Sequence, residues 1–310
     1  MKKTLVALAA VAATSAAFAE VSIYGLVDMA YTTATGANAS LTHQYAPSHI
    51  GFKGSEDLGN GMKAEFNIST QAPLATSGVG AGWESFVGVS GGFGAVKIGQ
   101  FFDPAFIHNA TYNLNGMSAF GASNVGLLQG ALTARQIQYS LPAMVTGLSV
   151  VASQSIGVAA AAANSTTYTP AVTEIGDKTD VAINYAIGDF SVGYVTSASA
   201  MDNGTETKEV GTGISYNFGV AKVAYNSTSE KAGSAATAKG SAMGISVPFG
   251  ATTFAYESSS AKDAAGAKST GTLLQVKYDL SKRTFAMLQR AIVKTTSTTN
   301  TTAVGIVHTF

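Results

Sequence analysis

Apolar and polar residues alternate through long stretches of the chain after residue 20. In residues 48–70, SHIGFKGSEDLGNGMKAEFNIST, Ile50 and Phe52 take one face and His49 and Lys53 the other, and the alternation resumes after a Gly-Asn-Gly turn. Successive side chains of a strand point to opposite faces of its sheet. The pattern therefore predicts an antiparallel hairpin with one apolar face and one charged face.

The same pattern recurs down the chain, and short turns alternate with longer irregular stretches. We predict sixteen strands, which begin near residues 20, 48, 61, 83, 94, 134, 146, 178, 190, 209, 220, 241, 251, 271, 283 and 301. Strands of about ten residues, with short turns at one end and long loops at the other, are typical of outer-membrane barrels. The expected fold class is all-β, a sixteen-stranded antiparallel transmembrane β-barrel.

Composition agrees with this fold class. The chain has 34 glycines and 6 prolines, and 12% of its residues are charged, which fits neither a helical protein nor a charged disordered one. After residue 19 no apolar run reaches the length of a membrane helix, so a membrane-embedded chain must cross as a closed barrel. A soluble, secreted β-sandwich or β-helix is the alternative, but the hairpin spacing and the aromatic residues near strand ends favour the membrane. These aromatic residues are Tyr24, Phe86, Tyr185, Tyr216, Phe218, Tyr225, Phe249, Phe254 and Tyr278.

The first 19 residues differ from the rest of the chain. Two lysines, an apolar run and the small-x-small sequence Ala17-Phe18-Ala19 predict a secretory signal peptide over 1–19, followed by a barrel domain over 20–310. Without Lys2 and Lys3, 16 basic and 18 acidic residues remain, a formal charge of −2, which argues against nucleic-acid binding. No cysteine is present, so one large fold rather than disulfides is expected to stabilise the exported chain.

Several segments together resemble the general-diffusion porins of Gram-negative bacteria, in particular the beta-proteobacterial branch of sixteen-stranded trimeric porins. These segments are VSIYGLVD, SHIGFKGSEDLGNGMKAEF, FVGVSGGFGAVKIGQ, SYNFGVAKVAY, KYDLSKRTF and VGIVHTF, in that order along the chain. The resemblance implies a homotrimer in the cell outer membrane, in contact with membrane lipid and lipopolysaccharide, that passes small hydrophilic solutes and ions by diffusion. It also implies that the third long loop folds back into the lumen.

The final segment, VGIVHTF, ends on Phe310. Alternation places Val304, Ile306 and Phe310 on the lipid-facing side. Pairing of this strand with the first one, around Val21–Tyr31, would close the barrel and remove both sheet edges. A terminal phenylalanine also resembles the signal that is read by the barrel-assembly machinery, so we expect Phe310 to act in assembly.

The segment 102–133 has no strand pattern and is long for an irregular connection in a compact domain. It is rich in apolar residues, so we expect it to pack against the inner wall of the barrel and to narrow the pore. The alternative is an external loop that packs on its neighbours or at a trimer contact.

A pore of this kind selects ions through its width and through the charges on its wall. The candidate constriction and lumen-wall residues, which include Asp103 at the entrance of the long loop, are Asp28, His49, Lys53, Lys63, Glu65, Glu84, Lys97, Asp103 and Arg135.

The chain departs from its relatives at several basic positions. Where they commonly read S-R-x-G-x-R-G-S-E-D, His49 and Lys53 replace two arginines, and Gln138 and Val307 occupy other places that are often basic. We therefore expect weak ion selectivity rather than the strong anion selectivity of the branch. If His49 lines the constriction, conductance should depend modestly on pH near neutrality; a solvated wall residue without that effect is the alternative.

An enzyme is the other class to weigh. The chain has four histidines and many serines, but it has no G-x-S-x-G or H-E-x-x-H sequence and no cysteine nucleophile. No metal-ligand spacing stands out and no cofactor is expected. The functional alternatives to an open pore are therefore an outer-membrane barrel with hydrolase activity and a plugged structural or adhesive barrel.

Overall fold

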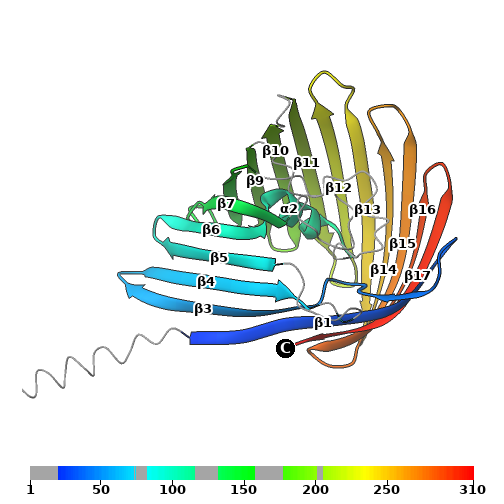
Figure 1. Ribbon diagram of the computed structural model, residues 1–310, viewed down its shortest axis with the longest axis horizontal. Helices are drawn as coiled ribbons and strands as arrows, with labels where there is room; N and C mark the ends of the chain where they lie inside the picture. Colours follow the sequence, from blue (N-terminus) through cyan, green and yellow to red (C-terminus); the bar gives the residue numbers. More distant parts are fainter. Residues whose placement is uncertain (1–19, 73, 75–81, 116–131, 158–176, 201–204) are drawn as a thin grey trace, which may run out of the picture.

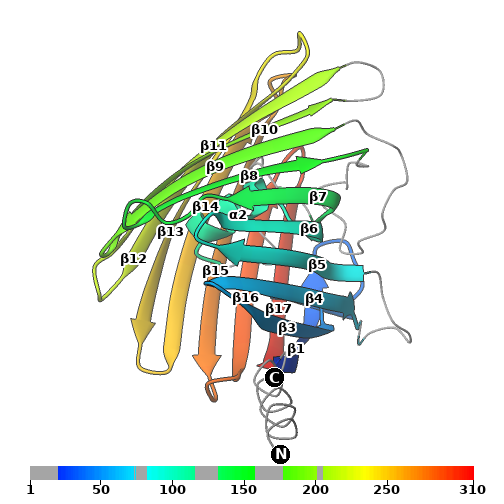
Figure 2. The ribbon, with the colours of Figure 1, turned by 90° about the vertical axis from the view of Figure 1, so that its left-hand side faces the viewer.

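In the computed structural model the chain forms a closed antiparallel β-barrel (Figures 1 and 2). The structure describes residues 20–72, 74, 82–115, 132–157, 177–200 and 205–310. The expected signal peptide, residues 1–19, lies outside the described residues. None of the helices in the described ranges is long and apolar enough to cross a membrane.

Sixteen strands form the wall of the barrel, as the sequence predicts. They are β1 (Glu20–Ala34), β3 (His49–Gly59), β4 (Met62–Gln71), β5 (Gly82–Gly91), β6 (Gly94–Phe102), β7 (Leu132–Ser140), β8 (Leu148–Ser155), β9 (Lys178–Ile187), β10 (Phe190–Ala200), β11 (Glu206–Asn217), β12 (Lys222–Ala232), β13 (Ala238–Phe249), β14 (Thr252–Lys262), β15 (Lys268–Asp279), β16 (Thr284–Lys294) and β17 (Thr298–Thr309). An additional short strand, β2 (Ser40–Thr42), lies in the first long loop and pairs with β1. The sequence pattern did not predict β2.

The first and last strands close the barrel. β17 pairs with β1 from Leu26 opposite Thr309 to Ala34 opposite Thr301, and β1 also pairs with β3. Phe310 extends the seam, because its N–H donates to the Gly25 carbonyl and its carbonyl accepts from the Gly25 N–H, both at 3.1 Å. The predicted pairing of the final strand with the first is therefore confirmed.

Strand positions agree with prediction best at the short-turn end of the barrel. At the long-loop end β11, β13, β15 and β17 begin at residues 206, 238, 268 and 298, each three residues before the expected start. The outward-facing and inward-facing residues are both polar there, so alternation no longer marks the strand, although the backbone ladder continues.

The two faces of the wall differ in the sense that the alternation predicts. Ile23, Ile68 and Val87 lie exposed on the outer face, whereas Asp180 and Asn226 lie buried on the inner face. A barrel with an apolar exterior and a polar interior suits a membrane around it and water within it.

Two of the aromatic residues expected near the membrane interface face the lumen instead. The Tyr24 hydroxyl donates to Asn67 Oδ1 at 2.7 Å, and the Phe86 ring lies beneath Lys97 Nζ at 4.9 Å. Each ring supports a polar or cationic group of the lumen wall, which membrane exposure would forbid.

The third long loop enters the barrel and forms a helix, α2 (Pro104–Tyr112), which packs against the inner wall at β8–β12. Figures 1 and 2 show this helix within the ring of strands. For residues 103–115 the inward position is confirmed, and an external loop is excluded for that part. Residues 116–131 lie outside the described residues.

Candidate pore constriction

Helix α2 begins at a well-defined cap. Asp103 Oδ1 accepts a hydrogen bond of 2.8 Å from the Phe106 N–H, and Pro104 occupies the first turn, where its missing N–H costs no helical bond. The Asp103-Pro104 pair therefore starts the helix directly after β6.

A buried ion pair holds the start of the helix against strand β9. The second carboxylate oxygen of Asp103 accepts from Thr133 Oγ1 at 3.2 Å and from Lys178 Nζ on β9. Lys178 Nζ also lies 3.3 Å from Asp180 Oδ1, and both carboxylate side chains are fully buried. Because loss of one partner leaves a buried charge uncompensated, this cluster holds the loop against the wall.

Glycines on the wall let the helix approach closely. A Cβ at Gly213 on β11 would lie 2.1 Å from Tyr112 Cδ2, and a Cβ at Gly193 on β10 would lie 2.6 Å from the Tyr112 hydroxyl oxygen. The two glycines stand directly opposite each other in the ladder. A Cβ at Gly211 would lie 3.3 Å from the ring of His108, so side chains of α2 occupy the space that these glycines leave.

Polar contacts continue along the same side of the loop. Asn226 Nδ2 on β12 donates to Asn109 Oδ1 at 2.9 Å, and the Tyr112 hydroxyl lies 3.1 Å from Ser191 Oγ. Asn115, beyond the helix, donates from Nδ2 to Glu257 Oε2 on β14 at 3.2 Å. The loop thus follows the inner wall from β9 to β14.

His108 is buried between α2 and the wall, and neither ring nitrogen has a hydrogen-bond partner among the described residues. Burial lowers the pKa of His108 to about 4, because the imidazolium form would lose its hydration there. His108 therefore packs as a neutral ring at neutral pH.

The lumen-facing side of α2 carries no charge. Ile107 and Thr111 are exposed on it, and the Thr111 hydroxyl donates back to the Ile107 carbonyl at 2.7 Å. Residues 104–134 contain no Asp, Glu, Lys or Arg. The helix itself therefore adds no charge to the pore at this level.

The candidate charges of the wall stand on strands outside β8–β12. In the ring of sixteen strands, β1, β3 and β4 stand opposite β10–β12. Lys53 on β3 lies with Nζ 5.1 Å from the centre of the Tyr24 ring. Glu65 on β4, Gly88 on β5 and Lys97 on β6 form one cross-strand row, so a carboxylate and an ammonium group flank a glycine gap.

Aromatic rings and carboxylates surround Lys97. Its Nζ lies 4.1 Å from the centre of the Phe101 ring and 4.9 Å from that of Phe86, and the carboxylates of Glu84 and Glu65 interact with it electrostatically. The ring contacts and the carboxylates offset part of the cost of burying the ammonium group, so Lys97 is a charge-compensated residue of the wall rather than a freely solvated cation.

A row of aromatic rings links this wall to the helix. His49 stacks on Trp83 with ring centres 5.6 Å apart, Trp83 meets the edge of Phe102 at 5.1 Å, and Phe102 stacks on Phe106 of α2 at 4.2 Å. His49 Nδ1 also lies 2.9 Å from the Pro47 carbonyl oxygen. The structure therefore places His49 in a packed ring cluster of the lumen wall.

Asp28, Lys63 and Arg135 lie apart from this group. The Asp28 carboxylate is covered by the first long loop, where Oδ2 accepts from the N–H groups of Gln44 and Ala46 at 2.8 and 3.0 Å. Lys63 is exposed beside the short turn between β3 and β4.

Arg135 sits at an irregularity between β6 and β7. Its φ is +51°, the ladder shifts register beside it, and its Nη1 donates to the Gly157 carbonyl at 3.3 Å. The extra residue in β7 re-aims the side chain, so strand alternation does not determine its direction.

Sequence reasoning missed the residues that hold the helix in place, namely Lys178, Asp180 and Asn226. One signal was available, because Gly193 and Gly213 occupy inward positions where a polar side chain is the usual choice. Paired inward glycines indicate close approach of another backbone or ring.

The comparisons with known proteins agree with this architecture. The family model described as "Gram-negative porin" matches residues 4–297. The major outer membrane protein P.IB of Neisseria meningitidis serogroup B is 39% identical over 113 residues, which cover 32% of this chain and 34% of that protein. The P.IB protein of Neisseria lactamica is 32% identical over 153 residues, 45% of this chain and 44% of that protein. The matched regions thus span between a third and a half of these curated relatives.

Solved structures match over much more of the chain. An anion-selective porin from Comamonas acidovorans has a TM-score of 0.78 at 23% identity, with coverage of 94% of this chain and 100% of that one. Salmonella typhi OmpF, in a complex with daunomycin, has a TM-score of 0.73 at 15% identity, with coverage of 94% and 98%. These likenesses establish the fold, and together with the family match they confirm that the chain is a member of the Gram-negative porin family.

Proposed function

We propose that this protein forms a water-filled channel in the outer membrane, through which small hydrophilic solutes and ions diffuse passively. The observation that carries the proposal is the position of α2, which lies inside a closed barrel against β8–β12 and leaves a charged wall on the other side. A pore narrowed by an internal loop admits small solutes and excludes large ones.

Weak ion selectivity is part of this proposal. Lys53 and Lys97 stand against Glu65 and Glu84 on β3–β6, outside the β8–β12 wall against which α2 packs, and the lumen side of α2 adds no charge. Farther round the barrel Lys178 is neutralised by two carboxylates. With two cations and two anions on these four strands, neither sign of permeating ion is strongly favoured there.

Assembly as a homotrimer in outer-membrane lipid, with recognition by the barrel-assembly machinery through Phe310, completes the proposal. A Cβ at Gly25 would lie 2.4 Å from Phe310 Cζ, so the terminal ring lies directly over Gly25 at the seam between β1 and β17. This position is where the last strand meets the first.

Planar-bilayer recording of the purified protein tests the channel proposal. We expect conductance in steps of three for a trimer, and a reversal potential well below the ~59 mV that a fully selective pore would show in a tenfold salt gradient. Glu65→Gln/Glu84→Gln should shift the reversal potential toward anion preference. Glu206→Gln, the same chemical change at an exposed residue on the outer face, should leave it unchanged.

Two results would contradict the proposal. Absence of current from correctly folded protein would favour a plugged barrel. Near-complete anion selectivity of the wild type would refute weak selectivity while leaving the channel itself intact.

A further inference from the structure

The first long loop, between β1 and β3, contains more chain than the wall can hold. Its last six residues, 43–48, connect Thr42, which lies opposite Ala30 of β1, to His49, which lies opposite Leu26. Only three residues of β1 lie between these two partners. Because a strand in the ladder uses one residue for each residue of its neighbour, the surplus must leave the plane of the sheet.

This surplus, residues 43–48, is called the strap below, and it folds over the lumen face of β1. Asp28, Val307 on β17 and Phe285 on β16 form one cross-strand row, so their side chains point to the same face. Val27, on the other face of β1, is 37% exposed, whereas Asp28 is 1% and Val307 0% exposed. A fully buried valine on the inner wall shows that something covers this row.

The cover is held by the Asp28 carboxylate. Its Oδ2 accepts hydrogen bonds from three successive N–H groups, those of Gln44 at 2.8 Å, Tyr45, and Ala46 at 3.0 Å. Successive N–H groups that converge in this way form an anion-binding nest, and hydrogen bonds to an ionised acceptor are the strong ones. Pro47 has no N–H, so the run of donors ends there.

Two side chains of the strap fix its ends. The Ser48 hydroxyl accepts from the Asp28 N–H at 2.9 Å and donates to the Asp28 carbonyl at 3.1 Å, so it bonds the main chain of β1 where no strand pairs with it. Gln44 is fully buried, and its Nε2 donates to the Ala303 carbonyl of β17 at 3.3 Å. The strap therefore crosses from β1 onto β17.

Tyr45 places an aromatic ring in the lumen. Its ring meets that of Phe285 on β16 edge to face, with the ring centres 5.5 Å apart, and the residue is 37% exposed. Lys277 Nζ lies 4.8 Å from the centre of the Phe285 ring and 2.9 Å from Asp279 Oδ1. The Tyr45 ring is thus packed on one side and open to water on the other.

The strap lies across the lumen from helix α2. In the ring of sixteen strands β16, β17 and β1 stand opposite β8, β9 and β10, and α2 packs against β8–β12. The interior is therefore bounded by a loop segment on each of two facing sides.

We propose that the strap is a second constriction element, that Asp28 is the positioning residue that holds it, and that Tyr45 limits the size of the solutes that pass. The proposal rests on the proposed channel function and deepens it, because two loop segments rather than one then set the width of the pore. Asp28 acts here through the strap, since its carboxylate is covered by loop N–H groups.

Two measurements on the folded full-length protein test this proposal. The first is the size limit for polyethylene glycols that enter the channel and lower its conductance in a planar bilayer. The second is hydrogen exchange of the amides of residues 44–46. Asp28→Asn keeps the shape of the side chain but weakens the acceptor, so these amides should exchange at least ~10-fold faster, and the size limit should shift to larger polymers.

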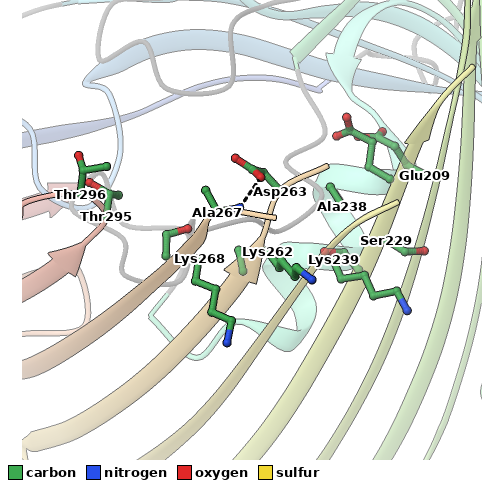
Figure 3. Close-up of a pocket in the computed structure, with 14 residues that line it drawn as sticks. Glu209, Ser229, Ala238, Lys239, Lys262, Asp263, Ala267, Lys268, Thr295 and Thr296 are labelled. Carbon is green, nitrogen blue, oxygen red and sulfur yellow. Dashed lines mark hydrogen bonds between the residues drawn. The ribbon is translucent and has the colours of Figure 1, made fainter. Parts of the chain in front are cut away.

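Asp263→Asn is the matched control. Asp263 also accepts an N–H bond in a long loop, but from within its own turn, where the Ala267 N–H donates to Oδ1 at 2.8 Å (Figure 3). This change should leave both the size limit and the exchange of residues 44–46 as in the wild type. Tyr45→Ala should raise the size limit although Asp28 is intact, and Tyr45→Phe, which keeps the ring, should not.

A wild-type size limit in both Asp28→Asn and Tyr45→Ala would overturn the proposal. So would wild-type exchange of residues 44–46 in Asp28→Asn. A wild type that carries no current would refute the channel function itself, and the exchange measurement would still decide whether Asp28 holds the strap. In that case a current that appears only in Asp28→Asn would identify the strap as the plug of a closed barrel.

Discussion

Gly213 on β11 is the position where the contact between α2 and the wall is most sensitive to one added atom. A Cβ there would lie 2.1 Å from Tyr112 Cδ2, whereas non-bonded carbons rest about 3.5 Å apart or more. The ring cannot swing away freely, because Tyr112 is 2% exposed and its hydroxyl contacts Ser191. Gly213→Ala therefore forces the ring or the whole helix to move by about 1.4 Å.

The cost of that movement follows from the contacts that it disturbs. Overpacking of this kind costs about 1–3 kcal/mol, and the hydrogen bond of the Tyr112 hydroxyl contributes about 1 kcal/mol more when it is lost. Docking of the helix should therefore weaken by about 2–4 kcal/mol. If the amides of α2 exchange through undocking of the helix, their hydrogen exchange should become at least ~30-fold faster.

Hydrogen exchange of the 105–112 amides, measured by mass spectrometry on the folded barrel, is the assay. Gly244→Ala is the matched control, since a Cβ there would lie at an ordinary 3.4 Å from Leu114 Cδ1. Repeating Gly213→Ala in a Tyr112→Ala background removes the clash and should abolish most of the acceleration. Wild-type exchange in Gly213→Ala, or equal acceleration in both backgrounds, would refute the reasoning.

Three further predictions concern single groups. Asp103→Asn keeps a capping side chain but removes a negative charge beside Lys178. Because Asp180 remains, the loss of loop-docking free energy should be below the ~3–5 kcal/mol of a fully broken buried pair. Limited proteolysis of the folded protein should then cleave the loop faster than in the wild type. Burial in the docked helix lowers the pKa of His108 to about 4. Between pH 6.5 and pH 4 the His108 ring is therefore protonated when the helix is undocked and neutral when the helix is docked. Docking should weaken by about 1.4 kcal/mol per pH unit in that window, so open-channel noise should rise there, and His108→Gln should remove the rise. Phe310→Ala should lower the yield of folded barrel in cells without changing the conductance of the folded fraction; normal yield would contradict the assembly role.

The barrel itself was predictable because one physical rule governs it. A strand between lipid and water must alternate, and residues such as Ile50, Phe52 and Lys53 show that alternation plainly. The rule does not apply beyond the lipid, where both faces of a strand can be polar. β13 and β15 therefore begin closer to the long-loop end than the alternation indicated. It also has no bearing on α2, whose start depends on the local chemistry of Asp103 and Pro104.

The site was predictable only in part, because alternation gives the face of a side chain and not its partner. Lys53 lies over the Tyr24 ring and Glu65 stands opposite Gly88 in the ladder, and the role of both in the constriction stays a prediction. The Asp103–Lys178 pair joins residues far apart in sequence, and no local pattern links them. Asp28 is inward-facing too, but loop N–H groups cover its carboxylate, and the register shift at Arg135 breaks the alternation on which its prediction depended.

Thiol modification during channel recording tests the central claim most directly. The chain has no cysteine, so Lys53→Cys on the inner face and Phe52→Cys on the outer face of β3 each introduce a single thiol at adjacent positions. A charged, membrane-impermeant methanethiosulfonate reagent should reduce the current through Lys53→Cys channels and leave Phe52→Cys channels unchanged. An unchanged current through modified Lys53→Cys channels would contradict a diffusion path along this wall.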